Sequence, residues 1–341
     1  MRDIDRPVAI QATETPLPGR LVAGARDLIT AARSERTREA YGKAWAAFVV
    51  WCAAHGRQSL PASPETVAAW MTDLAQCGRA PATINSYLAA VAVAHRTAGF
   101  PLDRKSPLIA DVWKGIGRTA SRAQRQARPI TAAGLQSLID GLAATLPADV
   151  RDAALLALGW AGALRRSEIV GLDWSEPGSG SGFLQLDERG LSITLVRSKS
   201  SQADAVVVVV PCADMPAACR AVRAWIEFAG IKPGEPLFRP IDKAQRIGAG
   251  RLTDRSIARI IKDRIEAHAS ASGSTPAEAA DLAAQFSGHS LRAGYATAAA
   301  SKDVPTYRIQ QHTRHKTAEM VARYVREADK WGKSGLKGVG F

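Results

Sequence analysis

Four residues in the carboxyl-terminal third of the chain combine side chains that can handle a bound anion. His289 and Arg292 form an H-x-x-R motif, and His315 and Tyr324 follow within the stretch 286–324. In a helix, a separation of three residues places His289 and Arg292 on one face, where both side chains can bind the same anion. A tyrosine hydroxyl beside such a site can act as a nucleophile if a histidine accepts its proton.

The spacing from His315 to Tyr324 indicates that a helix begins between them. Nine residues span two and a half turns, so in a single helix the two side chains would face opposite ways. We expect Thr317 to cap the helix, with His315 in the loop before it. The predicted apolar stripe is Met320, Val321, Tyr324 and Val325. Taken alone, each histidine could also be an ordinary polar residue, and Tyr324 could be a core residue whose hydroxyl lies at the surface. A catalytic role is therefore indicated only by the four residues together.

The composition predicts a globular protein that binds a polyanion. The 341 residues suffice for two domains, or for one large domain. A surplus of 45 Lys and Arg over 32 Asp and Glu gives a net charge of +13, which favours nucleic acid. No run approaches about 18 apolar residues, so no membrane partner is expected. The first residues lack the pattern of a signal peptide, and we expect a cytoplasmic, nucleoid-associated protein.

The cysteines and histidines do not indicate a metal site. The four cysteines show no C-x-x-C spacing and are expected to be reduced thiols. They are Cys52, Cys77, Cys212 and Cys219. The pair His312 and His315 has no cysteine or acidic ligand nearby, so we expect neither a metal nor a cofactor.

The amino-terminal third reads as a small helical domain after a flexible tail at 1–22. Within 23–117 we expect four helices, the second capped by Ser63 and the last covering 109–116. In the third helix the predicted inward residues are Ile84, Leu88, Val91 and Val93. The polar residues at its start, which could enter a major groove or simply face solvent, are Thr83, Asn85 and Ser86.

A basic linker is predicted at 118–130. Between positions 114 and 128 the chain has no acidic residue and five basic ones, namely Lys114, Arg118, Arg122, Arg125 and Arg128. Such a run suits a phosphate backbone, although a merely solvated linker is the alternative. We take Arg118, Arg122 and Arg125 as DNA-binding candidates.

From 131 to 331 the pattern is mixed. Thr131 can cap a helix that ends near Ala144, and a long apolar helix is expected from Val150. Three charged residues interrupt that helix, namely Arg165, Arg166 and Glu168. A separation of three puts Arg165 and Glu168 on one face, where the carboxylate can hold the guanidinium, and Arg166 then points away. A purely structural ion pair is the alternative.

Three β-rich runs follow at 183–187, 191–197 and 205–211, and they predict a three-stranded antiparallel sheet. Lys199 falls in the second turn, where it is either a cationic arm or a solvated lysine. Helices resume at 213–230 and again within 251–269. The later helix carries a basic stripe that could read a groove or be merely exposed, made of Arg255, Arg259 and Lys262.

These motifs, in this order, resemble the active-site signature of the tyrosine recombinases, also called the phage integrase family. GALRRSEIVGL resembles the first arginine box, RSK at 197–199 the β-turn lysine and GHSLRAG the H-x-x-R box. The resemblance covers about residues 30–330. The chain departs from the family pattern at 313–315, where Thr-Arg-His stands in place of Leu-Gly-His.

The resemblance implies a mainly α protein that clamps duplex DNA at recombination sites, with an all-helical core-binding domain and an α+β catalytic domain at 131–331. It also implies a catalytic set in which the arginines and His315 hold the phosphate, His289 is the base, Lys199 the acid and Tyr324 the nucleophile. The six residues are Arg165, Lys199, His289, Arg292, His315 and Tyr324.

The resemblance further implies assembly. The segment 332–341 would dock into a neighbour and join four subunits on two DNA sites, while the free protein would be a monomer or a weak oligomer. Two alternatives stay open, namely relaxation activity like that of a type IB topoisomerase and a catalytically silent DNA-binding relative.

Overall fold

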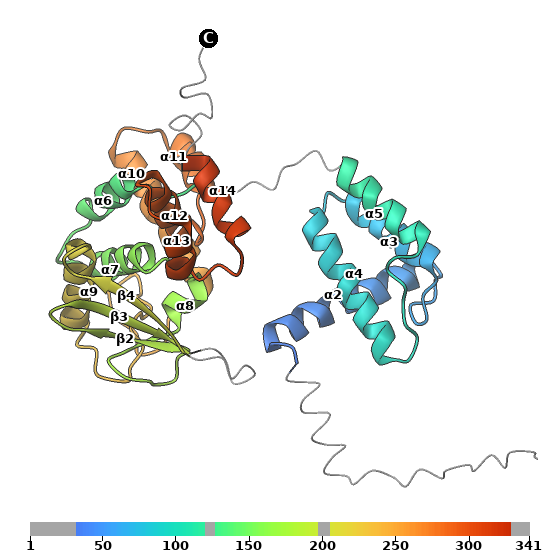
Figure 1. Ribbon diagram of the computed structural model, residues 1–341, viewed down its shortest axis with the longest axis horizontal. Coiled ribbons are helices and arrows are strands. Elements are labelled where there is room, and N and C mark those ends of the chain that lie inside the picture. Colours follow the sequence, from blue (N-terminus) through green and yellow to red (C-terminus); the bar gives the residue numbers. More distant parts are fainter. Residues whose placement is uncertain (1–31, 120–126, 197–204, 329–341) are drawn as a thin grey trace, which may run out of the picture. The chain divides into compact units, whose positions relative to one another are not determined.

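The computed structural model describes residues 32–119, 127–196 and 205–328 (Figure 1). The chain divides into two compact units, residues 1–125 and 126–341. The limits given above for the tails, the linker and the two domains remain predictions. Within the described ranges, no helix is both long enough and apolar enough to cross a membrane.

The described part of the first unit is helical. Its helices are α2 (Glu35–Ala54), α3 (Pro64–Gln76), α4 (Pro81–Thr97) and α5 (Pro107–Thr119). Ser63 caps α3 as predicted, because its hydroxyl accepts from the Thr66 backbone N–H. Trp70 stands at the centre of the core, 4.8 Å from the ring of Phe48 and 5.8 Å from that of Tyr87.

One inward position on α4 was predicted wrongly. Ile84, Leu88 and Val91 are buried, but Val93 is only half-buried. The helical period continues from Val91 to His95, which is buried and accepts from the Ala62 backbone N–H through Nε2 at 2.9 Å. A histidine therefore completes the inner face of this helix and holds the loop before α3.

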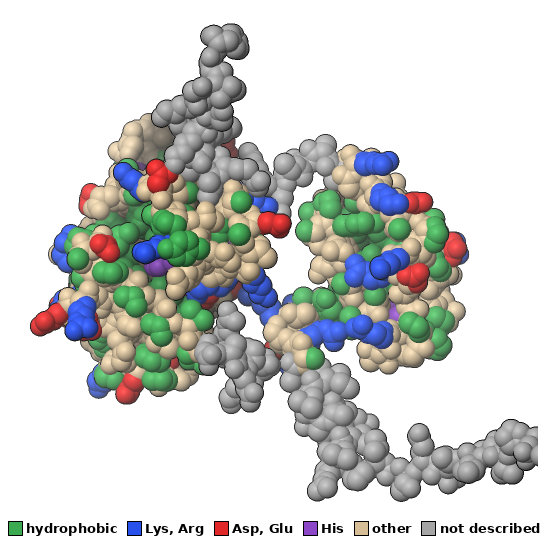
Figure 2. Space-filling view, viewed as in Figure 1, with side chains coloured by type: hydrophobic (Ala, Val, Ile, Leu, Met, Phe, Trp, Pro, Cys, Tyr) green, Lys and Arg blue, Asp and Glu red, His purple; other side chains and the backbone are tan. Residues whose placement is uncertain are grey.

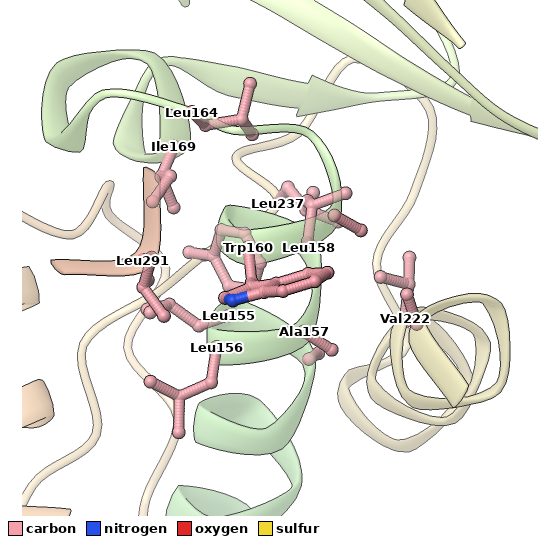
Figure 3. Close-up of a cluster of buried hydrophobic side chains, with 14 of the residues drawn as sticks. Leu155, Leu156, Ala157, Leu158, Trp160, Leu164, Ile169, Val222, Leu237 and Leu291 are labelled. Atoms are coloured by element: carbon pink, nitrogen blue, oxygen red, sulfur yellow. The ribbon is translucent and has the colours of Figure 1, made fainter. Parts of the chain in front are cut away.

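The second unit combines helices with a small sheet. Its helices are α6 (Ala132–Asp140), α7 (Pro147–Ala161), α8 (Arg166–Val170), α9 (Pro216–Ala229), α10 (Asp254–Ala271), α11 (Pro276–Ala284), α12 (Ser290–Ser301), α13 (Thr306–Thr313) and α14 (Ala318–Ala328). The core surrounds α7, whose Leu155 and Leu158 are fully buried. Figure 3 shows Val222 of α9 and Leu291 of α12 directed toward this helix.

The expected long apolar helix is wrong, because a turn divides it. Helix α7 ends at Ala161, Gly162 caps it, and Ala163 has a positive φ of 45°. Arg165 then adopts an extended conformation at the N-cap of α8. The turn directs the backbone carbonyl of Ala163 toward the guanidinium of Arg292, which donates to it at 2.8 Å.

The sheet has four strands in the order β1-β2-β3-β4. They are β1 (Leu172–Trp174), β2 (Gly182–Leu186), β3 (Gly190–Leu195) and β4 (Val206–Pro211). The three predicted strands pair antiparallel, and β1 adds a parallel neighbour to β2. The sequence missed β1 because three residues are too few to show alternation. Buried Asp173 stabilises its connection by accepting from the backbone N–H groups of Gly178 and Gly180 and by pairing with Arg251.

The expectation of four reduced thiols is wrong for one pair. Cys212 and Cys219 form a disulfide with their Cα atoms 5.7 Å apart. The two residues lie close because β4 runs directly into α9. Cys52 and Cys77 are free. In the described part of the chain, no three His, Cys, Asp or Glu side chains gather in a way that could hold a metal ion.

Candidate active site

Four of the six residues with predicted chemistry meet where α12, α14 and the α13–α14 loop converge. His289 is the N-cap of α12 and Arg292 lies in its first turn. The imidazole Nε2 of His289 is 2.8 Å from the hydroxyl oxygen of Tyr324 on α14. The ring of His315 stacks on Tyr324 with centroids 5.7 Å apart. Residues distant in sequence thus place a phenol between two imidazoles.

Helix α12 is fixed against the core by close backbone contact. A Cβ added at Gly294 would lie 2.0 Å from the carbonyl oxygen of Ile130 and 2.7 Å from Nε1 of Trp160. Only glycine allows this approach. Leu291, on the same helix, is fully buried. The first turn of α12, and with it Arg292, is therefore held in one place.

Arg292 is a buried cation with unused donor capacity. Its side chain is 1% exposed, and its Nη1 donates to the carbonyl of Ala163. Its Nη2 is buried and has no hydrogen-bond partner among the described residues. Burial, together with the charges of Arg165 and Arg314, lowers the pKa of Arg292 to about 10. Such a group is suited to an incoming anion, which would accept from Nη2 and offset the crowded positive charge.

Arg165 is held near the same site by hydrogen bonds to Glu168. Its Nη1 donates to Oε1 of Glu168 at 2.5 Å, and its backbone N–H donates to Oε2 at 2.7 Å. The pairing agrees with the prediction, but the shared helix face does not, because Arg165 precedes α8. Burial acts to raise the pKa of Glu168, yet the charges of Arg314 and Arg165 and the bonds from Arg165 lower it overall. Arg165 remains 46% exposed and can meet a ligand.

The surroundings of both histidines of the site favour their neutral forms. Burial, then the charges of Arg292 and Arg165, lowers the pKa of His289 and brings that of His315 to about 4. Thr313 donates its hydroxyl to the carbonyl of Ile309 at 2.6 Å, so this oxygen accepts from Nδ1–H of His315 at 2.7 Å. Nε2 of neutral His315 is therefore unprotonated.

Helix α14, which carries Tyr324, begins where expected, directly after Thr317. Val321 and Tyr324 are buried as predicted, but Met320 is 48% exposed. The buried face is centred between Val321 and Tyr324, so Met320 falls at its edge and the predicted stripe was too wide. The side chain of Val325 lies outside the described residues.

The remaining predicted residues are not all described. Lys199, Arg122 and Arg125 lie outside the described residues. Asn85 and Ser86 are exposed at the start of α4 and Thr83 is half-buried there, while Oδ1 of Asn85 accepts from Arg104 at 2.7 Å. The exposed arginines are Arg118 at the end of α5 and Arg255 and Arg259 on α10, whereas Lys262 is half-buried. Figure 2 shows Lys and Arg side chains on the surfaces of both units. Their contacts with DNA remain predictions.

Sequence reasoning missed Arg314, which lies inside the network around Arg165 and Arg292. Its Nη2 donates to the carbonyl of Ala163 at 2.9 Å and to Oε2 of Glu168 at 2.9 Å. The signal available was the departure of residues 313–315 from the family pattern.

Comparisons with known proteins point to one family. Residues 129–330 match the phage integrase family. An integrase/recombinase XerD homolog of Selenomonas ruminantium is 33% identical over 322 residues, which cover 91% of this chain and 87% of that protein. The recombinase Cre of Escherichia phage P1 is 24% identical over 295 residues, covering 84% and 82%.

Solved structures support the fold. The Tn1549 transposon integrase in complex with circular intermediate DNA superposes with a TM-score of 0.54 at 17% identity, covering 81% of this chain and 84% of that one. A lambda integrase dimer bound to a COC′ core site gives a TM-score of 0.53 at 14% identity, covering 96% and 85%.

Proposed function

Because the chain belongs to the phage integrase family of tyrosine recombinases, we propose that it is a site-specific DNA recombinase acting through a 3′-phosphotyrosyl intermediate on Tyr324. The observation that carries the proposal is the contact of 2.8 Å between the Tyr324 hydroxyl and Nε2 of His289. It lies beside Arg292, whose unused Nη2 is suited to a phosphate.

Arg165 and Arg292 favour nucleophilic attack on the phosphodiester by offsetting its negative charge. A phosphodiester repels nucleophiles through its own charge, and the transition state concentrates charge on the non-bridging oxygens. Arg292 and Arg165 present planar forks to those oxygens. The loss of one such donor commonly slows a reaction by about 10² to 10³ fold.

Tyr324 attacks once His289 accepts its proton. A phenol with a pKa of about 10 is a poor nucleophile at neutral pH, so a base is required. Neutral His289 is already placed to accept at Nε2. A bond forms between the tyrosine oxygen and phosphorus while the bond to the 5′ oxygen breaks, and Lys199 donates a proton to the departing oxygen. The ester bond is conserved, so this chain's residues carry the step without ATP or a metal ion.

His315 acts as a donor only after it gains a proton. In the free protein Nδ1–H is engaged by Thr313, so Nε2 must be protonated before it can donate to a phosphate oxygen. A bound phosphate offsets the positive charges that lower the pKa of His315, and it therefore favours the second proton.

Strand exchange follows when the 5′ hydroxyl of a second duplex attacks the phosphotyrosyl bond. We assign this exchange to a tetramer on two recombination sites. An apolar groove of about 520 Å³ beside α12 is the surface we assign to residues 332–341 of a neighbouring subunit. Its lining includes Trp160, Met215, Tyr295, Ala298 and Val304. A protein cut after Trp331 should still cleave DNA and fail to form tetramers on it, and tetramers of normal stability would contradict the assignment.

The test of the proposed function begins with DNA selected from random duplexes by the Tyr324→Phe protein. On a nicked duplex carrying the selected site, the wild-type protein should form a denaturant-resistant adduct and Tyr324→Phe should not. Two such duplexes should exchange strands. Relaxation of supercoiled DNA without exchange would favour the topoisomerase-like alternative, and binding without any cleavage would favour the silent relative.

A further inference from the structure

Arg314 occupies a backbone position that favours glycine. It closes α13 in the left-handed conformation, with φ 56° and ψ 41°. A side chain with a Cβ is strained there, which is why glycine commonly ends helices in this way. The family pattern carries glycine at this position, whereas this chain carries arginine. The arginine side chain makes contacts that glycine could not make.

The guanidinium of Arg314 joins the loop after α13 to the turn between α7 and α8. Its side chain is 6% exposed. Nη1 donates to the carbonyls of His312 at 2.7 Å and Gly162 at 3.2 Å. Nη2 donates to the carbonyl of Ala163 and to Glu168, each at 2.9 Å. Both terminal nitrogens are thus used inside the protein, while the buried Nε has no hydrogen-bond partner among the described residues.

Each phosphate-binding arginine shares a partner with Arg314. The carbonyl of Ala163 accepts from both Arg292 and Arg314. Glu168 accepts from both Arg165 and Arg314. Arg165 in turn donates from Nη2 to the backbone carbonyl of Arg314 at 3.3 Å. Arg314 is therefore connected to Arg292 through Ala163 and to Arg165 through Glu168.

The sharing of Glu168 has a consequence for Arg165. Oε2 of Glu168 accepts from Arg314 and from the backbone N–H of Arg165, while Oε1 alone accepts from the Arg165 fork. If Arg314 were absent, Oε2 would be open to a bidentate pair with Arg165. That pairing would draw the Arg165 fork away from a phosphate.

We propose that Arg314 is a positioning residue that holds Arg165 and Arg292 at the spacing one phosphate requires. It acts through Glu168 and the carbonyl of Ala163 and does not touch the DNA. The inference rests on the proposed function of this site. It assigns a role to a residue type that the family pattern lacks at this position.

The test compares cleavage of two nicked duplexes, both carrying the DNA site selected by Tyr324→Phe. One has an ordinary phosphodiester at the scissile position, and the other has a methylphosphonate, which lacks the negative charge. The variants are Arg314→Gly and Arg314→Lys. The control is Ser175→Gly, which also places glycine at a positive φ, 67°, outside the network. Rates are measured in single turnover at saturating protein.

On the phosphodiester, Arg314→Gly should slow formation of the covalent adduct by about 10² fold, because small misplacements of catalytic groups cost this much. On the methylphosphonate, where placement of the arginines matters less, the loss should be no more than a few fold. Ser175→Gly should match the wild type. Arg314→Lys keeps the positive charge but loses the two terminal nitrogens of the guanidinium, so adduct formation on the phosphodiester should also be slow.

Two outcomes would overturn the inference. One is cleavage of the phosphodiester duplex at the wild-type rate by folded Arg314→Gly. If the glycine variant does not fold, the same result with Arg314→Lys would count. The other is an equal loss on both substrates, which would indicate a general structural defect. A wild-type protein that forms no adduct would count against the proposed function itself, so the two failures are distinguishable.

Discussion

Replacing Arg292 by methionine should stabilise the free protein while removing its ability to cut DNA. Burial, together with the charges of Arg165 and Arg314, lowers the pKa of Arg292 from its higher ordinary value to about 10. At about 1.36 kcal/mol for each pK unit, the buried cation costs about 3 kcal/mol at neutral pH. Below pH 10 the group is charged in both folded and unfolded protein, so this cost is fully present at pH 7 and declines only as the pH rises above 10.

The methionine variant also loses one hydrogen bond. The bond from Arg292 to the carbonyl of Ala163 contributes about 1.5 kcal/mol, and that carbonyl keeps Arg314 as a donor. The net expectation is a gain of about 1 to 2 kcal/mol in the free energy of unfolding, measured in denaturant without DNA. Adduct formation should fall by at least about 10² fold.

The control for this prediction is Arg151→Met. Arg151 is also buried, but it pairs with Asp152 at 2.7 Å and donates to the carbonyl of Arg239. Its loss should destabilise the protein by about 1 to 3 kcal/mol. If the Arg292→Met protein unfolds more easily than the wild type in the absence of DNA, the buried charge of Arg292 does not destabilise the free protein, and the reasoning is refuted.

Two further predictions concern α12 and its histidine. Gly294→Ala places a Cβ against the carbonyl of Ile130, so it should cost about 1 to 3 kcal/mol in unfolding free energy and slow cleavage by about 10² fold. Gly42→Ala, with open space around it, is the matched control, and equal behaviour of the two variants would count against the close contact. Because the pKa of His289 is lowered, its base form persists below the ordinary value of 6.5. In a His315→Gln protein, which keeps a hydrogen-bond donor and removes the second titrating histidine, the second-order cleavage rate should stay level at neutral pH and drop only on the acid side of 6.5. A drop that begins above pH 6.5 would speak against His289 as the base.

Local signals predicted much of the helical framework. Ser63 and Thr131 cap helices where expected. These features depend on neighbours within one or two turns, which spacing and side-chain type reveal directly. The same reasoning predicted the beginning of α14 after Thr317, and thus the separate placement of His315 and Tyr324.

Features set by contacts between distant segments were not predictable. The break after Ala161 lies in an apolar run whose composition suits a continuous helix, and the turn is stabilised by Arg292 and Arg314 from segments far along the chain. Strand β1 is similar, because Asp173 gains its partner Arg251 from a distant segment. The contacts of Arg314 likewise join segments that are far apart in the sequence, so spacing within one segment could not predict them.

Esterification of the Tyr324 hydroxyl to a cut DNA strand is tested most directly on the adduct itself. The adduct formed on the nicked, selected duplex is digested with protease and nuclease, and the modified peptide is identified by tandem mass spectrometry. We predict a nucleotide 3′-phosphate attached to Tyr324. A nucleotide attached to any other residue, such as the exposed Tyr307, would contradict the claim.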